Sequence, residues 1–138
     1  MSENATPQLT EYARRLLAFE MAEGKTNAAK ARAAFRVCEK LRESLGRLMG
    51  VDSYRALLSR ALASAGSEVP GLQALQITMY GSLVGWDKLA AKLNPRTMAG
   101  GEVVLVSHLL ELFSTFIGTA LMQRLLDDIW PEIEELHV

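Results

Sequence analysis

The hydrophobic pattern is strongest between Gly101 and Trp130, where Gly118 is the one helix-breaking residue before Pro131. This stretch predicts one long C-terminal helix. Its apolar side chains cover several sides of the helix over residues 103–121, which is typical of a helix that other elements surround. We therefore expect the rest of the chain to wrap around it.

The apolar face of this predicted helix changes sides near its C-terminal end. At about 100° per residue, the apolar positions occupy one broad half up to Leu121, and after Met122 they move to the opposite half. Either the helix bends at Gly118, or its last turns pack on the first helix of the same chain or on a second copy. The same helix also carries a strip of small residues, Ser107, Ser114 and Gly118. This strip either packs against another backbone or faces solvent. The candidate interface residues are Ser107, Ser114, Gly118, Met122, Leu125, Leu126, Ile129 and Trp130.

Three amphipathic helices are predicted upstream, over residues 7–22, 28–49 and 52–65. Gly24, followed by Thr26 and Asn27, indicates a stop and a new cap between the first two, although one bent helix stays open. Arg42 projects on the apolar side of the second helix. Its stem is expected to lie on the core with the guanidinium reaching water; a buried ion pair or a ligand contact is the alternative.

Residues 75–86 have a spacing that fits either a helix or a hairpin. Gly81 and Gly85 favour the hairpin, and a two-residue turn at Gly81 and Ser82 would pair Met79 with Val84 and Ile77 with Trp86. Asp87 is then expected to cap a short helix through Leu93, which Asn94-Pro95 ends. Residues 96–100 would be a loop, with Glu102 near the positive end of the long helix.

These elements predict a mainly α fold, a small helical bundle around a long C-terminal helix with one possible β-hairpin near residues 75–86. Residues 1–138 are expected to form one domain, with flexible tails at 1–5 and 132–138. Hydrophobic residues make up 49% of the chain and charged residues 22%, as in folded soluble proteins. The lone Cys38 and the lack of a signal segment indicate a cytoplasmic protein.

Charge and hydropathy argue against nucleic acid and membrane as partners. Basic residues gather in the first half of the chain but are interleaved with Glu39 and Glu43, which is typical of a solvated helix face. The uncharged run Leu112–Gln123 is shorter than the roughly 20 residues of a membrane span, so we interpret it as buried core.

Candidate chemistry is sparse, and we expect no catalytic, cofactor-binding or metal site. His108 and Glu111 lie three apart on one helix, but His137 is the only other histidine, and a metal needs more ligands. With Arg42 they form the one speculative polar site. Cys38 lies on an apolar stripe and is interpreted as a core residue.

The pattern as a whole favours a non-enzymatic protein–protein interaction or regulatory module that binds a partner protein or forms a homodimer through its C-terminal helix. The alternative is a sensor or carrier of a small apolar ligand. In that case Met79, Phe113, Phe116 and Met122 would line a pocket between the helices, and Arg42 or His108 would supply its polar contact.

Overall fold

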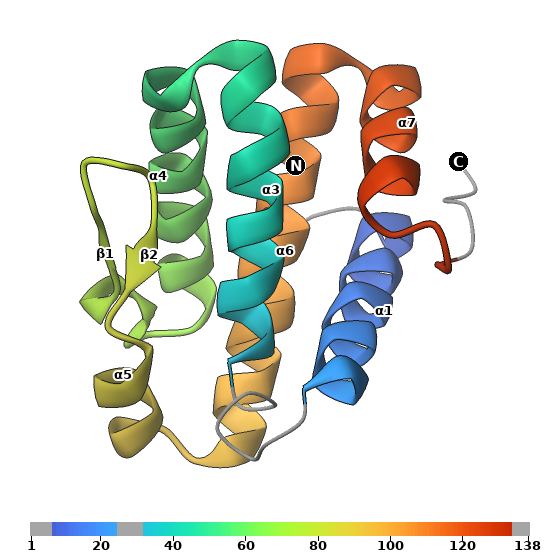
Figure 1. The fold of residues 1–138 in the computed structure, drawn as a ribbon. Coiled ribbons are helices and arrows are strands. Elements are labelled where there is room, and N and C mark those ends of the chain that lie inside the picture. The colour runs from blue at the N-terminus through green and yellow to red at the C-terminus, as the bar shows by residue number, and fades with distance from the viewer. Residues whose placement is uncertain (1–6, 25–31, 134–138) are drawn as a thin grey trace.

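The structure is a computed structural model that describes residues 7–24 and 32–133. It confirms the mainly α-helical bundle with a small hairpin (Figure 1). In chain order the elements are α1 (Pro7–Glu23), α3 (Ala33–Met49), α4 (Val51–Glu68), the short 3-10 helix η1 (Leu72–Ala74), β1 (Gln76–Ile77), β2 (Leu83–Val84), α5 (Trp86–Lys92), α6 (Pro95–Ile117) and α7 (Thr119–Ile129).

Helix α6 is the central element, as the sequence predicts. It contacts α1, α3, α4, α5 and α7, and every side chain from Leu105 to Leu110 is buried. A helix that is apolar on several sides is stable only when its neighbours cover those sides. The five surrounding helices provide that cover.

We expected this helix to begin at Gly101, but it begins at Pro95. Asn94 does not end a helix but caps α6, since its side-chain oxygen accepts a hydrogen bond from the Thr97 amide at 2.8 Å and Pro95 takes the first helical position. The expected loop at 96–100 is therefore the first turn and a half of α6. Helix α5 begins at Trp86 after Gly85, and the Asp87 side chain makes no cap.

The expected single helix to Trp130 is also wrong, because the chain turns sharply at Gly118. This residue has φ 91° and ψ 150°, a conformation open almost only to glycine. Its amide donates to the Ser114 carbonyl at 2.9 Å, and the Met122 amide donates to the Gly118 carbonyl at 3.1 Å. The bend that we considered at Gly118 is therefore a one-residue connection between two helices, which we call a glycine corner. After it, α7 folds back along α6 and α3 (Figure 1).

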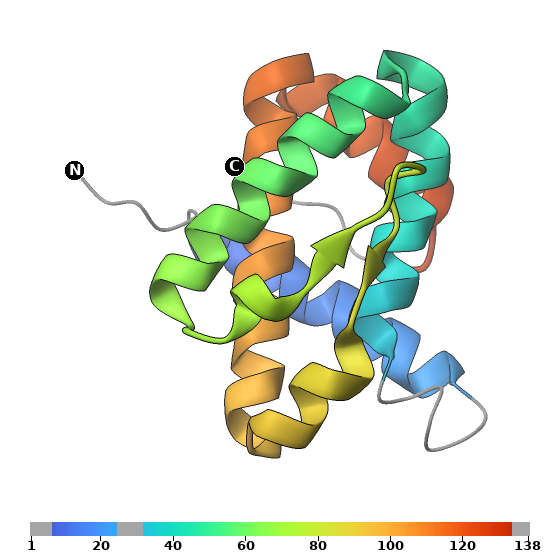
Figure 2. The same ribbon diagram turned by 90° about the vertical axis from the view of Figure 1, so that its left-hand side faces the viewer.

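A second corner, at Gly50, has nearly the same geometry. Gly50 has φ 88° and ψ 153° between α3 and α4, with matching hydrogen bonds from its own amide to Gly46 and from the Tyr54 amide to its carbonyl. Both corners lie at the same end of the bundle (Figures 1 and 2). Residues at the same sequence distance from Gly50 and from Gly118 are buried in both helix pairs. These matching residues are Leu41 and Leu109, Leu45 and Phe113, Tyr54 and Met122, and Leu58 and Leu126.

The predicted hairpin is present, but its register differs from the expected one. Gln76 pairs with Val84 and Ile77 with Leu83, so the expected pairs of Met79 with Val84 and of Ile77 with Trp86 are wrong. The loop has three residues, closed by the Thr78 amide donating to the Ser82 carbonyl at 2.8 Å. Gly81, at φ 88°, supplies the left-handed residue that ends such loops.

Helices α1 and α3 are separate and pack against each other, but the expected cap at Thr26 and Asn27 lies outside the described residues, as do 1–5 and 134–138 of the expected tails. Ile133 belongs to the fold, not to a tail. Its amide donates to the Trp130 carbonyl at 3.1 Å, and its side chain packs on the core.

Candidate functional site

Exposed apolar side chains gather at one end of the molecule. Of the eight large hydrophobic residues that are exposed in the described chain, six lie on the two glycine corners or at the tip of the hairpin, which points toward the same end (Figures 1 and 2). We call these six the apolar end: Leu48, Val51, Met79, Tyr80, Phe116 and Leu121. The remaining two, Met21 and Val84, lie elsewhere.

The geometry of the corners explains why these side chains are exposed. Leu48 and Phe116 each lie two residues before a corner glycine, and they are 48% and 58% exposed. A helix that stops at a one-residue corner has no following turn to cover the side chains of its last turn. The space beside both glycines is open, because a Cβ at Gly50 or Gly118 would meet nothing within 4 Å.

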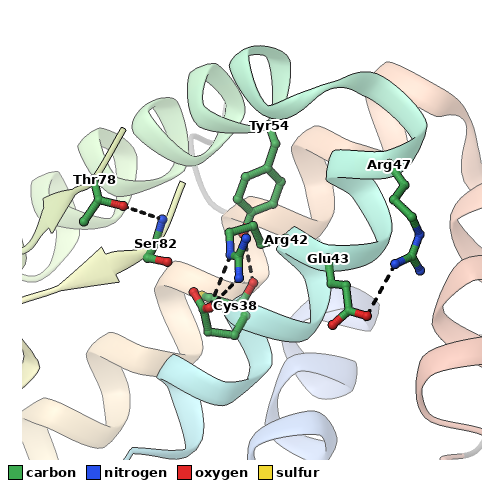
Figure 3. Close-up of polar contacts among 8 residues, drawn as sticks. Cys38, Arg42, Glu43, Arg47, Tyr54, Thr78 and Ser82 are labelled. Atoms are coloured by element: carbon green, nitrogen blue, oxygen red, sulfur yellow. Dashed lines mark hydrogen bonds and ion pairs between the residues drawn. The ribbon is translucent and has the colours of Figure 1, made fainter. Parts of the chain in front are cut away.

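The hairpin tip is braced against the helices, so Met79 and Tyr80 are held in place while being about 70% exposed. Arg55 Nε donates to the Thr78 carbonyl at 3.1 Å. The backbone of Gly81 lies close to the side chains of Tyr54 and Arg42. Figure 3 shows Arg42 beside the Tyr54 ring, with Thr78 and Ser82 closing the hairpin next to them.

Charge is unevenly distributed over the apolar end. The α3–α4 corner carries Asp52 and an exposed pair in which Arg47 lies 3.4 Å from Glu43 (Figure 3). The α6–α7 corner is uncharged from Leu112 to Gln123. Our interpretation of that run as buried core is wrong in part, because the corner projects Thr115, Phe116 and residues 118–121 into solvent.

The predicted interface residues after the corner are mostly inside the molecule. Met122, Leu126 and Trp130 are at most 2% exposed, and Leu125 and Ile129 are half-buried against the core. The change of apolar face after Met122 is therefore satisfied within the chain, since α7 reverses direction and turns that face toward α3. Trp130 cannot act as a contact surface for a second protein while the fold is intact.

The predicted strip of small residues is likewise partly buried and partly at the surface. Ser107 is buried, and its hydroxyl donates to the Val103 carbonyl at 2.6 Å. The hydroxyls of Ser114 and Thr119 lie 3.0 Å apart across the corner. Gly118 is exposed. Of the predicted strip, Ser114 and Gly118 therefore border the apolar end.

Glu20 is a buried polar residue that sequence reasoning missed. Its carboxylate is 1% exposed and is bound by Arg36, Lys40 and the Trp130 indole, whose Nε1 donates at 2.9 Å. Burial alone would raise the pKa of Glu20, but the hydrogen bonds from these three partners outweigh it and lower the pKa below its usual value. The available signal was a carboxylate four residues after Leu16, on the apolar stripe of α1.

The speculative polar site does not form. The Arg42 guanidinium binds Glu39 at 2.8 Å, and the buried His108 ring binds Glu68 of α4 in place of Glu111. Within the described ranges, no three His, Cys, Asp or Glu side chains are grouped as metal ligands. Burial raises the pKa of the Cys38 thiol to about 12, so this core residue stays protonated at neutral pH.

The pocket expected for a small ligand is not built from the residues we named. Phe113 stacks on Tyr54 with 5.9 Å between ring centroids, and Met122 is buried, whereas Met79 and Phe116 are exposed. A different hollow, of about 530 Å³, lies beside Trp86 between α3, the hairpin and α5. A smaller hollow, of about 370 Å³, borders His108 and Arg14.

Comparisons with protein-family models, with curated proteins and with solved structures find no match for this chain. By length and composition alone, α6 could cross a membrane, and half of its most apolar window is buried inside the bundle.

Proposed function

We propose that this protein is a non-enzymatic, cytoplasmic interaction or regulatory module that associates with a second copy of itself through the apolar end. One observation carries the proposal: six of the eight exposed large apolar residues of the described chain gather there. Large apolar side chains that are exposed at one end of a soluble protein usually mark a contact surface. The surface differs from the one that the sequence indicated, because Trp130 is buried and Phe116 takes its place.

A second copy fits the charge pattern of this end. In a twofold dimer, each residue near the axis meets the same residue of the other copy, so a charge there would face a like charge. The corner around Phe116 and Leu121 has no charge in residues 112–123. The mixed charges of Glu43, Arg47 and Asp52 lie at the other corner, where they can form the polar rim of the contact.

The contact should be weak. Six partly exposed side chains make a small surface beside the roughly 800 Å² per partner of a standard stable interface. We therefore expect a dissociation constant on the order of tens of micromolar. Such an affinity suits a regulated association that changes with protein concentration or with a competing partner.

Sedimentation velocity over roughly 5 to 500 µM tests this proposal. The wild-type protein should shift from monomer to dimer, and the double variant Phe116→Ser, Leu121→Ser should stay monomeric. Met21→Ser is the matched control, since Met21 is 48% exposed on α1, away from the apolar end. A wild-type monomer throughout the range, or a double variant that dimerises like wild type, would refute the proposal.

A further inference from the structure

The hollow beside Trp86 has the size of a small-molecule site. Its volume of about 530 Å³ falls within the roughly 300–1,000 Å³ that such sites occupy. It lies between the start of α3, the base of the hairpin and α5, toward the end of the bundle opposite the glycine corners (Figures 1 and 2). It is thus separate from the apolar end.

The walls of the hollow are aromatic and aliphatic. Phe35 of α3, Leu83 of β2 and Trp86 of α5 line it. The indole Nε1 of Trp86 donates to the Leu83 carbonyl at 2.8 Å, so this ring is fixed in place and its one polar group is already satisfied. Trp86 is 6% exposed, so it offers a bound molecule only a narrow apolar strip of its ring beside the more exposed Phe35, which favours a flat apolar ligand.

The rim of the hollow carries one uncompensated positive charge. Arg32 and Lys88 are cations, and Asp87 is the one carboxylate among the lining residues. Arg32 binds Asp87 at 2.7 Å, with the two side chains 51% and 78% exposed. Lys88 is exposed, and no ion pair joins it to another described residue. The rim therefore attracts a single negative charge, while Asp87 would repel a second one.

The exposed Arg32–Asp87 pair does not prevent Arg32 from binding a ligand. Ion pairs this accessible to water contribute little free energy, from about 0 to 1 kcal/mol. A guanidinium also has several donors and can serve two carboxylates at once. An incoming carboxylate can therefore share Arg32 with Asp87 and bind Lys88 as well.

We propose that the hollow beside Trp86 binds small aromatic monocarboxylates, with the ring against Phe35 and Trp86 and the carboxylate against Lys88 and Arg32. This site is independent of the apolar end and of any self-association there. It gives the protein a small-molecule site that no sequence motif distinguishes.

A titration with naphthoate, followed by the indole N–H resonance of Trp86 in a proton–nitrogen correlation spectrum, tests the site. The expected result is a saturable shift of Trp86 with a dissociation constant below about 1 mM, and weaker binding of the neutral naphthalene methanol. The Trp130 resonance should move less, because Trp130 is 0% exposed and lies outside the lining residues.

Charge variants make the test specific. Lys88→Gln should weaken naphthoate binding roughly three- to fivefold, as expected for one exposed ion pair. Lys92→Gln, an exposed lysine on the same helix, should leave it unchanged. Asp87→Asn should strengthen binding, because it frees Arg32 and removes the repelling charge; a purely structural role of Asp87 would not do so.

Three results would each overturn the proposal: no shift of Trp86 up to the solubility limit of naphthoate, equal affinity for the neutral alcohol, or the same loss in Lys92→Gln as in Lys88→Gln. All three variants change exposed side chains, and circular dichroism verifies that they fold. A monomeric protein that still binds naphthoate would separate this site from the proposed self-association.

Discussion

At the scale of single residues, Glu102 is a carboxylate whose buried surroundings disfavour its negative charge. We expected it near the start of the long helix, where the dipole would stabilise it. Because α6 begins at Pro95, Glu102 lies two turns inside the helix and half-buried. Burial raises its pKa from 4.5 to about 7. The folded state therefore favours the protonated form of Glu102.

This shift predicts a pH-dependent loss of stability. A carboxyl with a raised pKa in the folded state makes folding less favourable as pH rises from about 4.5 to about 7. Glu102→Gln should thus raise the free energy of unfolding by up to about 3 kcal/mol at pH 8 and by nearly nothing at pH 4.5, from about 1.4 kcal/mol per pKa unit. Urea denaturation at both pH values measures the difference. An effect of equal size at both pH values would contradict the prediction.

At the scale of elements, the two glycine corners decide the fold. Each converts what could be one long helix into two helices with a single residue between them. Their positive φ angles are unfavourable for any residue with a Cβ. The corners set the direction of α4 and α7, and they also leave Leu48 and Phe116 exposed at the apolar end.

Alanine substitutions distinguish conformational strain from steric contact. Gly118→Ala should lower the free energy of unfolding by roughly 1–3 kcal/mol through backbone strain alone, since an added Cβ meets nothing within 4 Å. Gly46→Ala is the control. It has equally open space but lies inside α3, so it should stabilise the protein by up to about 1 kcal/mol. Chemical denaturation of both variants gives the answer, and equal effects of the same sign would disprove the argument.

At the scale of the whole molecule, Glu20 joins parts of the chain that are far apart in sequence. Its carboxylate connects α1 to Arg36 and Lys40 of α3 and, through Trp130, to the end of α7. Lys40 also lies 5.9 Å from the Trp130 ring centroid, a cation–π contact. This cluster fixes the end of α7 onto the bundle.

Loss of the Glu20 charge should destabilise the protein. Glu20→Gln leaves two cations around a neutral group, and we expect a loss of about 2 kcal/mol, below the full cost of a buried pair because Lys40 is 43% exposed. The lowered pKa of Glu20 places this stabilisation above pH 4.5, and it is lost as pH falls through the folded-state pKa.

Thermal unfolding between about pH 3 and pH 7 tests the Glu20 prediction. Wild type should lose stability toward acid more steeply than Glu20→Gln. Glu11→Gln is the control, because Glu11 is more than half exposed and, among the described residues, forms ion pairs with Arg14 and Arg15 of its own helix; the melting temperature of this variant should stay close to wild type. A Glu20→Gln protein with the wild-type acid profile would rule out this role.

The sequence alone determined the local elements, because they depend on neighbouring residues. Apolar spacing located α1, α3, α4 and α6, and the glycines of 75–86 indicated the hairpin. The change of apolar face also left open a bend at Gly118 as one of two explanations, although we expected a single helix as far as Trp130. Cys38 as a core residue followed from its place on an apolar stripe.

Only the tertiary structure decided which elements pack on the apolar faces of the helices. The direction of a glycine corner, the Glu20–Trp130 contact across 110 residues and the pairing of His108 with Glu68 depend on residues that have no local relation in the chain. The same holds for the hollow beside Trp86, which three separate elements border. Sequence periodicity shows which face of a helix is apolar, but it does not show which element packs on that face. The packing of α7 on the bundle makes Trp130 a core residue, and the corner at Gly118 leaves Phe116 on the surface.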